Sequence, residues 1–310
     1  MQQWSDLTSC RLSAEKGDVN AQLYLGFACF YGFKTALNQK ESIYWFTLAA
    51  EQGCAEAQYE LAVRYEDEQG VKQDIDEAAK WYAKAAQQGY VKAMALMGDN
   101  GLSLHQLARE GSKEAQLALG HIYFEGNYKE RNYKKAVYWY KKAAEKGDKE
   151  AQYQLATLLK TGNGVSASEG DSLYWYQKAA ENGHADAQIS LAFIMIKTKE
   201  MEKAFYWFQQ SAMSGNAFAQ YNVGKMYLSG VGAAQDFIRA AEWLEKAALQ
   251  NDAEAQYWLG TLYDHGHGIA RELEKAMYWY QKAAKQGEPN SIEVLKEFFS
   301  QETGELCECH

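Results

Sequence analysis

The chain has 310 residues, 47% of them hydrophobic and 14% aromatic, which is enough to build a sizeable core. Its net charge of −9, from 32 basic and 41 acidic residues, argues against nucleic acid or an anionic membrane as the main ligand and permits a basic partner. Only Pro289 is a proline, against 25 glycines. Glycine must therefore end most elements, as in an all-helical chain.

The first 17 residues lack the basic start and the apolar stretch of a secretion signal, and no window approaches the roughly 20 apolar residues of a membrane span. We therefore expect a cytoplasmic protein. The five cysteines are irregularly spaced and odd in number, so no disulfide framework is indicated and we expect reduced thiols. They are Cys10, Cys29, Cys54, Cys307 and Cys309.

An internal repeat runs through most of the chain. The pair Ala-Gln begins at positions 21, 57, 115, 151, 187, 219 and 255, mostly 36 residues apart. Tryptophan recurs 24 residues after each of these alanines, except Trp207, which follows its alanine by 20. Two independent markers with the same period establish a true repeat.

Each repeat is predicted to be a hairpin of two helices. The first helix carries Ala-Gln, and the second carries Trp and ends in Lys-Ala-Ala-x-x-Gly, where glycine or Asn251 can adopt the left-handed cap. A Gly-x-Gly element, as in Gly230-Val231-Gly232, joins helix to helix rather than strand to helix, which argues against a phosphate loop. Hairpins this small must stack to bury their apolar faces.

The predicted organisation follows the chain. Residues 1–17 form an N-terminal capping helix, 18–89 two repeats, 90–111 a truncated repeat, 112–287 repeats four to eight, and 288–310 a C-terminal capping helix with a flexible tail. The truncated repeat is 14 residues short, so we expect a stub and a kink in the array. The repeat from Gly183 lacks four residues at its turn, which should tighten that hairpin.

Three motifs at a 36-residue period carry a family resemblance: Gly-x-x-x-Ala-Gln-x-x-Leu-Gly, a Gly-x-Gly-Val turn, and Lys-Ala-x-x-Trp-Tyr-x-Lys-Ala-Ala. Over about residues 14 to 299 the chain resembles the Sel1-like repeat, a relative of the tetratricopeptide repeat with its period of about 34 residues. The resemblance implies an all-α, right-handed α/α superhelical solenoid. It also implies adaptor or scaffold roles, with the first helices lining a concave surface.

Within each first helix, positions 0, +1, +4, +5 and +8 from the alanine of Ala-Gln repeat between copies and cluster on one side. Positions +3, +6 and +10 vary and lie opposite; we call them the free-face positions. From them we predict a partner-binding stripe of Tyr24, Phe27, Tyr31, Glu60, Asp67, His121, Glu125, Phe193, Lys225, Trp258 and His265. The alternative is that its aromatic rings pack on neighbouring helices and complete the core.

Other residues could carry chemistry. The acidic stretch Glu66 to Glu77 lacks calcium-loop spacing and is predicted to be a solvated turn, with a patch for a basic partner as the alternative. His265 and His267 could join Cys307, Cys309 and His310 in a zinc site if the tail folded back, although a frayed end is the simpler interpretation. The repeated tryptophans, such as Trp45, Trp139 and Trp279, are assigned to the core.

No nucleophile motif is present, and we expect neither catalysis nor a cofactor. The sequence favours a non-catalytic scaffold or adaptor that binds a protein partner, such as a basic effector, toxin or signalling protein, and no nucleic acid or membrane. One alternative is an immunity protein that neutralises a bacterial toxin by direct binding. Another is a metal-binding module or enzyme that uses His265, His267 and the Cys-rich tail.

Overall fold

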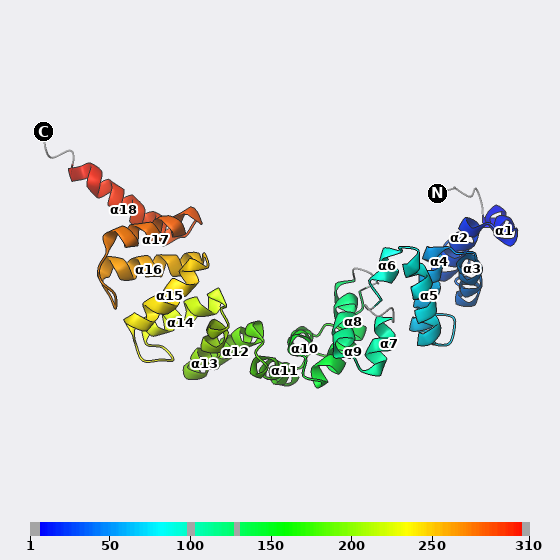
Figure 1. Ribbon diagram of the computed structural model, residues 1–310, viewed down its shortest axis with the longest axis horizontal. Helices are drawn as coiled ribbons and strands as arrows, with labels where there is room; N and C mark the ends of the chain where they lie inside the picture. The colour runs from blue at the N-terminus through cyan, green and yellow to red at the C-terminus, as the bar shows by residue number, and fades with distance from the viewer. Residues whose placement is uncertain (1–6, 98–102, 127–130, 306–310) are drawn as a thin grey trace. The chain divides into compact units, whose positions relative to one another are not determined.

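The computed structural model describes residues 7–97, 103–126 and 131–305, and this part of the chain is helical apart from an isolated bridge between Met97 and Ser103. Figure 1 labels the helices. They are α1 (Leu7–Glu15), α2 (Val19–Tyr31), α3 (Gln39–Glu51), α4 (Ala55–Asp67), α5 (Ile75–Gln87), α6 (Val91–Met94), α7 (Leu104–Glu110), α8 (Lys113–Glu125), α9 (Tyr133–Glu145), α10 (Lys149–Thr161), α11 (Glu169–Glu181), α12 (Ala185–Lys197), α13 (Met201–Met213), α14 (Ala217–Ser229), α15 (Phe237–Leu249), α16 (Ala253–His265), α17 (Leu273–Lys285) and α18 (Pro289–Glu305).

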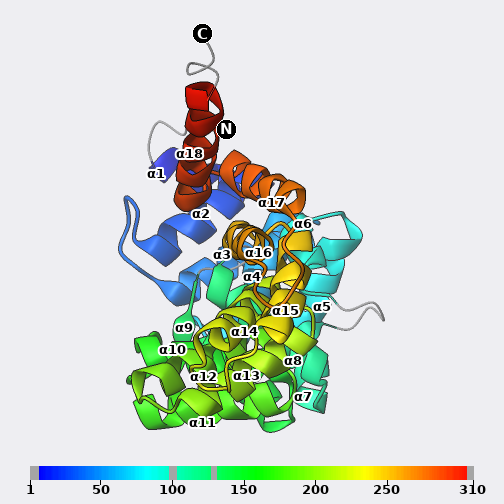
Figure 2. The same cartoon turned by 90° about the vertical axis from the view of Figure 1, so that its left-hand side faces the viewer.

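The chain forms two compact units. Unit 1 comprises Met1–Ala151 with Gly162–Ser166, and unit 2 comprises Gln152–Thr161 with Ala167–His310. In each unit consecutive helices pair as hairpins, such as α2 with α3 in unit 1 and α14 with α15 in unit 2. Figures 1 and 2 both show α16 beside α17. The predicted all-α array of stacked hairpins is confirmed.

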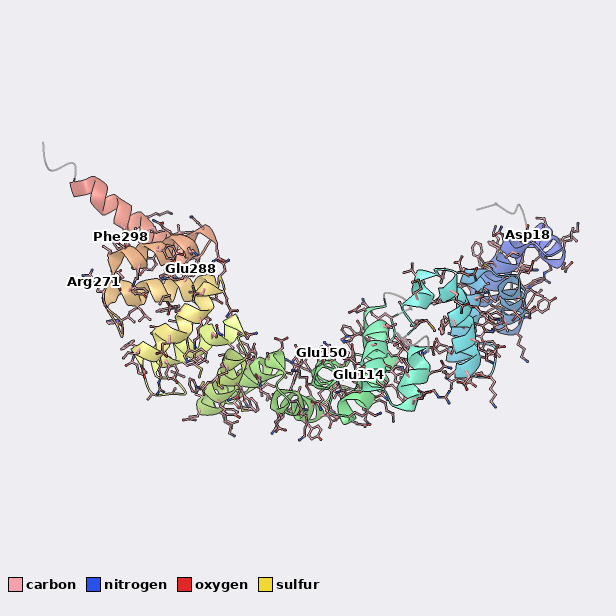
Figure 3. The ribbon with its side chains drawn as sticks, in the orientation of Figure 1. Asp18, Glu114, Glu150, Arg271, Glu288 and Phe298 are labelled. Atoms are coloured by element: carbon pink, nitrogen blue, oxygen red, sulfur yellow. The ribbon has the colours of Figure 1, made fainter. Side chains whose placement is uncertain are left out.

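Helix ends follow the local sequence. A short polar side chain caps the start of most hairpin helices; Asp18, labelled in Figure 3, accepts from the Ala21 amide at the start of α2. At the other ends, residues with positive φ stop the helix as predicted, for example Gly215 at 97° and Asn251 at 69°. Residues in the left-handed backbone conformation, placed at fixed intervals, therefore set the lengths of the helices in each hairpin.

The Gln of Ala-Gln is buried in every copy because it is the polar link between helices. In α4 the Gln58 amide donates to the Ala50 carbonyl at 3.0 Å and its oxygen accepts from Gln88 at 2.8 Å. Copies in both units repeat this arrangement. Where the residue 30 positions later is Lys146 or Phe218, the oxygen of Gln116 or Gln188 has no partner. A hydrogen-bonded amide in each repeat is thus part of the stacking.

The Gly-x-Gly turn is an inter-repeat contact. Its second glycine has positive φ and lies against the first residue of the preceding second helix, so that a Cβ atom would overlap that residue. The three Gly-x-Gly pairs are Gly164 with Tyr133, Gly232 with Met201, and Gly268 with Phe237, and Gly70 of the corresponding Glu68-Gln69-Gly70 turn lies against Gln39 in the same way. The motif therefore serves close packing of backbones between neighbouring hairpins.

Two repeats are shorter than the others. In residues 90–111 the described helices are α6, with four residues, and α7, with seven. Between α12 and α13 the connection contains three residues, 198–200, against seven between α14 and α15, as the shortened turn predicted. A kink of the array at α6 and α7 remains a prediction.

The core is built mainly from alanines and from rings of the second helices. Tyr82, Tyr140 and Tyr280 are almost fully buried. Of the tryptophans named as core, Trp45 and Trp279 are buried and Trp139 is half-buried. Cys10 and Cys29 are buried and Cys54 is half-buried, and all three are free thiols.

Candidate protein-binding surface

The structure separates the repeated and the variable positions of the first helices. In α2 the repeated residues Ala21, Gln22, Leu25, Gly26 and Cys29 are all buried. No free-face residue named in the stripe is fully buried. Stacking therefore leaves the predicted stripe at least partly accessible, and its role in binding remains a prediction.

In unit 1 the aromatic residues of the stripe differ in exposure. Tyr31 is 61% exposed, whereas Tyr24 and Phe27 are half-buried and pack against core clusters. Phe27 meets the Phe46 ring edge-on at 5.1 Å and stacks on Tyr31 at 6.4 Å. The alternative of core packing thus describes Tyr24 and Phe27 better, and Tyr31 is the exposed end of this row.

The charged and polar stripe residues of unit 1 also differ in exposure. His121 is half-buried, with Nδ1 3.0 Å from the Tyr140 hydroxyl, and Glu125 is exposed. Glu60 pairs with Arg64 one turn along the same helix, and Asp67 pairs with Lys135 of α9. Only Glu125 among these four is exposed.

In unit 2 the stripe contains exposed and packed residues. Phe193 is 48% exposed and lies 5.6 Å from Phe208 and 6.0 Å from Phe218, itself 43% exposed. Lys225 is exposed, with its ammonium 5.4 Å from the Tyr221 ring centroid. Trp258 is half-buried against the core cluster of α15 to α17. Phe193 and Phe218 together form an exposed aromatic pair.

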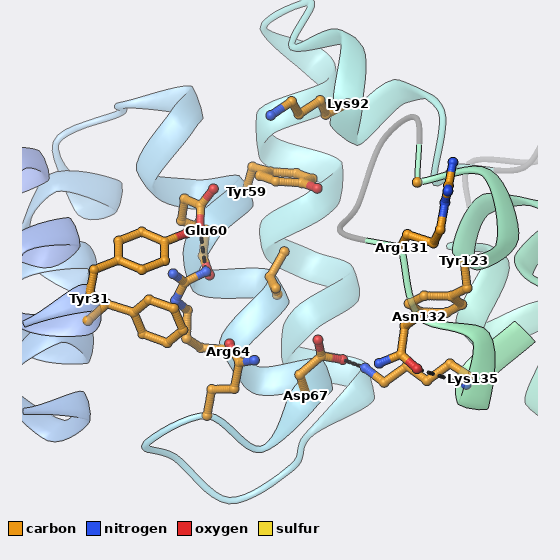
Figure 4. A pocket seen from close by; sticks show the side chains of 14 residues that line it. Tyr31, Tyr59, Glu60, Arg64, Asp67, Lys92, Tyr123, Arg131, Asn132 and Lys135 are labelled. Atoms are coloured by element: carbon orange, nitrogen blue, oxygen red, sulfur yellow. Dashed lines mark hydrogen bonds and ion pairs between the residues drawn. The ribbon is translucent and has the colours of Figure 1, made fainter. Parts of the chain in front are cut away.

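A groove lies on the first-helix side of unit 1, and we call it the α4–α8 groove (Figure 4). Its volume is about 580 Å³, and its walls come from α2, α4, α6, α8, the residues after α8, and the start of α9. It is lined by Phe30, Tyr31, Tyr59, Glu60, Val63, Arg64, Asp67, Gln69, Lys92, Tyr123, Gly126, Arg131, Asn132 and Lys135. Tyr31, Glu60 and Asp67 of the stripe meet here.

Arg64 anchors one wall of the groove. Its side chain is 3% exposed, and the guanidinium carbon lies 4.1 Å from the Phe30 ring centroid and 4.9 Å from that of Phe46. Burial raises the pKa of the Glu60 carboxyl, and the nearby Arg64 and Lys92 cations oppose that rise. Glu60 and Arg64 thus form a largely buried pair.

Glu66 corrects the prediction that the acidic stretch is a solvated turn. Its side chain is 3% exposed and is the centre of a buried hydrogen-bond network. The carboxylate accepts from Tyr82 at 2.6 Å and from Tyr123, and lies 2.6 Å from His105 Nε2. Asp74 and Asp76 of the same stretch are exposed as expected.

This network joins three hairpins. Glu66 lies in the last turn of α4, His105 belongs to α7 of the truncated repeat, and Tyr123 belongs to α8. Burial and the neighbouring Glu66 carboxylate raise the pKa of the Tyr82 and Tyr123 hydroxyls well above the ordinary value, so both remain donors. Since the truncated repeat is so short, α4 and α8 come within side-chain contact, and the groove lies between them.

The predicted stripe contains only three of the fourteen residues that line the groove, so sequence reasoning missed most of it. Arg64, Lys92, Tyr123, Arg131 and Lys135 lie outside the free-face positions or in the truncated repeat. The signal that could have found them is the 14-residue deficit, because removal of most of a hairpin brings its two neighbours together. The stripe was predicted from positions within single helices, and such positions carry no information about contacts between repeats.

The proposed metal ligands are not brought together among the residues that the structure describes. The His265 and His267 rings stack at 5.6 Å, and His265 Nδ1 lies 2.9 Å from the Thr261 carbonyl. No group of three or more His, Cys, Asp or Glu side chains in the described ranges is placed to hold a metal ion. Cys307, Cys309 and His310 lie outside those ranges.

Within the described residues, no helix is both long enough and apolar enough to cross a membrane. The net charge of the chain is −9, and the groove is lined by both acidic and basic side chains.

Solved structures share this fold. A protective antigen present in uropathogenic Escherichia coli strains, described as an SLR fold, is 33% identical with a TM-score of 0.60, over 96% of this chain and 68% of that one. A Sel1 repeat protein from Oxalobacter formigenes is 32% identical with a TM-score of 0.54, over 94% and 79%. An uncharacterized protein of Neisseria meningitidis serogroup B is 32% identical over 143 residues, and the match spans 43% of this chain and 30% of that relative.

The family model for the Sel1 repeat matches seven segments, and the residues between 90 and 113 are left unmatched. The matched segments are 19–54, 55–90, 113–148, 149–184, 194–216, 217–252 and 253–288. They cover most of the chain and agree with the resemblance drawn from the Ala-Gln and Trp spacing. The chain belongs to the Sel1 repeat family, whose repeats generally mediate protein–protein interaction.

Proposed function

We propose that this protein is a non-catalytic scaffold that binds a protein partner along the free-face positions of its first helices. The observation that supports this is the difference in burial between two sets of positions: the repeated positions are buried in the stacking, and the variable positions are at least partly accessible. Exposed aromatic side chains such as Tyr31 and Phe193 lie among these positions, and aromatic residues are enriched in interface hot spots.

The partner should first be identified by affinity capture from the source organism and mass spectrometry, and then purified. We expect Phe193→Ala to weaken its binding by about 1 to 4 kcal/mol while helicity and melting temperature change little. Tyr206→Ala is the matched control, since Tyr206 lies on α13 of the same hairpin and is 49% exposed against 48% for Phe193. Equal losses with both variants would contradict the proposal.

The rival function uses metal. Purified protein should contain no stoichiometric zinc by elemental analysis, and removal of residues 302–310 should leave partner capture intact. Of the ligands that this rival would use, His265 and His267 lie within the described residues, and no third His, Cys, Asp or Glu there is placed with them to hold a metal ion. Zinc at one ion per chain, together with loss of capture on removing the tail, would favour the metal module instead.

A further inference from the structure

We propose that the α4–α8 groove binds an extended acidic segment of the partner protein, with Lys92 and Arg131 pairing with its carboxylates. This inference rests on the proposed protein-binding function and specifies the chemistry that one part of the surface recognises. The charge of this segment is opposite to that of the basic partner that the net charge of the whole chain permitted.

The charges inside the groove divide into two kinds. Arg64 pairs with Glu60, and Lys135 pairs with Asp67, so these four side chains satisfy one another. They hold the walls, since the Lys135–Asp67 pair links α9 to the end of α4. The remaining lining charges are therefore the ones available to a ligand.

Those remaining charges are both positive. Lys92 of α6 has its ammonium 5.9 Å from the Tyr59 ring centroid and forms no ion pair with a described residue. Arg131 donates to the Glu125 backbone carbonyl at 3.2 Å and to the Tyr133 hydroxyl at 3.5 Å, and likewise pairs with no described carboxylate. Figure 4 shows Lys92 above Tyr59 on one wall and Arg131 near Tyr123 on the other.

The net charge of the groove is opposite in sign to the net charge of the chain. Four cationic side chains and two acidic ones line it, an excess of two positive charges in a protein whose net charge is −9. Carboxylates of a ligand are attracted locally by Lys92 and Arg131. A longer polyanion such as nucleic acid would instead extend beyond the groove into the negative field of the rest of the chain.

The other lining groups suit a peptide rather than a small anion. Of the apolar and aromatic lining residues, Tyr31 is largely exposed and Val63 is half-buried, whereas Tyr59 and Tyr123 are buried. The Tyr31 ring and the Val63 side chain therefore provide contact area for apolar or aromatic side chains next to the acids. The volume of about 580 Å³ lies within the usual range of ligand clefts. The expected ligand therefore alternates acidic with apolar side chains.

The test uses the full chain and a phage-displayed library of random 12-residue peptides, followed by anisotropy measurements with fluorescein-labelled versions of the selected peptides. We expect enrichment of Asp and Glu over the input library. Neutralising both cations in Lys92→Gln/Arg131→Gln should raise the dissociation constant about tenfold or more, and reversing them with Lys92→Glu/Arg131→Glu should raise it further. High salt should weaken wild-type binding.

The matched control changes the net charge equally outside the groove. Lys134 and Lys141 are exposed on α9 and line no part of it. Lys134→Gln/Lys141→Gln should leave the dissociation constant within about twofold. Circular dichroism of all variants should match the wild type, because none of the four side chains is buried.

Several outcomes would overturn the inference, and they separate it from the proposed function. Enrichment of basic or uncharged peptides would refute the acidic groove. So would selected peptides that bind the Lys92/Arg131 double variants as tightly as the wild type and lose affinity with Phe193→Ala. Either result would leave the proposed protein binding along the first helices intact. Absence of enriched peptides together with absence of a captured partner would refute both. A labelled single-stranded oligonucleotide that binds through Lys92 and Arg131 would replace the peptide by nucleic acid.

Discussion

At the scale of single residues, Glu66 shows what a local pattern cannot reveal. Its neighbours in sequence are acidic and polar, and such a stretch between helices is typical of a solvated turn. Its main donors come from elsewhere: Tyr82 is 16 residues away and Tyr123 is 57. A buried carboxylate needs such donors, and only the packing of three hairpins provides them.

We expect Tyr123→Phe to lower the free energy of unfolding by about 1.5 to 3 kcal/mol, because it removes a hydrogen bond to a buried charge. Tyr280→Phe is the control, since the Tyr280 hydroxyl donates to neutral Thr261 at 3.3 Å and should cost only about 0.5 to 1.5 kcal/mol. Urea unfolding followed by circular dichroism measures both. Equal costs would mean that the charge of Glu66 contributes nothing.

The buried tyrosines predict a loss of stability in alkali. Burial raises the pKa of Tyr280 to about 12, and burial with the Glu66 charge raises that of Tyr82 well above its ordinary value. Because the folded pKa values exceed the unfolded value of about 10, the stabilisation is complete below about pH 10 and is lost as the pH rises towards the folded values. Free energies of unfolding from about pH 8 to about pH 12 should decline above about pH 10. A flat profile would contradict this.

At the scale of elements, the sequence predicted most of the helices because their signals are local. Ala-Gln marks the first helix, Lys-Ala-Ala-x-x-Gly ends the second, and the left-handed residues Gly215 and Asn251 are where the pattern placed them. The truncated repeat was harder, since its helices of four and seven residues are stabilised mainly by neighbours. The contact made by each Gly-x-Gly turn could not be predicted, because its partner lies in the adjacent hairpin and local sequence patterns do not report such contacts.

The turn glycines can be tested with a matched pair in unit 2. Gly232 and Gly215 both have positive φ, at 77° and 97°, so alanine at either costs about 1 to 2 kcal/mol of backbone strain. A Cβ at Gly215 meets nothing within 4 Å, whereas one at Gly232 overlaps the Met201 backbone. We therefore expect Gly232→Ala to destabilise by about 1 to 3 kcal/mol more than Gly215→Ala.

Urea unfolding of the two glycine variants, monitored by circular dichroism, measures this difference. Equal destabilisation would show that the turn has room for a side chain and that the contact between neighbouring hairpins is unimportant. Greater loss with Gly215→Ala would be a stronger contradiction, because only backbone strain acts at that position.

At the scale of the whole molecule, the period predicted the array but not the groove. Repetition reports what every hairpin shares, and the α4–α8 groove exists where one hairpin is incomplete. The exposure of Phe193 could be predicted from the variable positions, because these positions share one face of a single helix. Lys92 and Arg131 were not found because their relation depends on contacts across the shortened repeat.

An array held by contacts between neighbours should also lose stability locally. Phe208 is 1% exposed in the core cluster of unit 2, and Phe208→Ala should cost about 3 to 5 kcal/mol in the hairpins that enclose it. Hydrogen exchange measured by mass spectrometry should accelerate in α12 to α15 and change little in α2 to α5, which belong to the other compact unit. Uniform acceleration would instead show one cooperative structure, in which stability depends on the complete chain rather than on each hairpin and its neighbours.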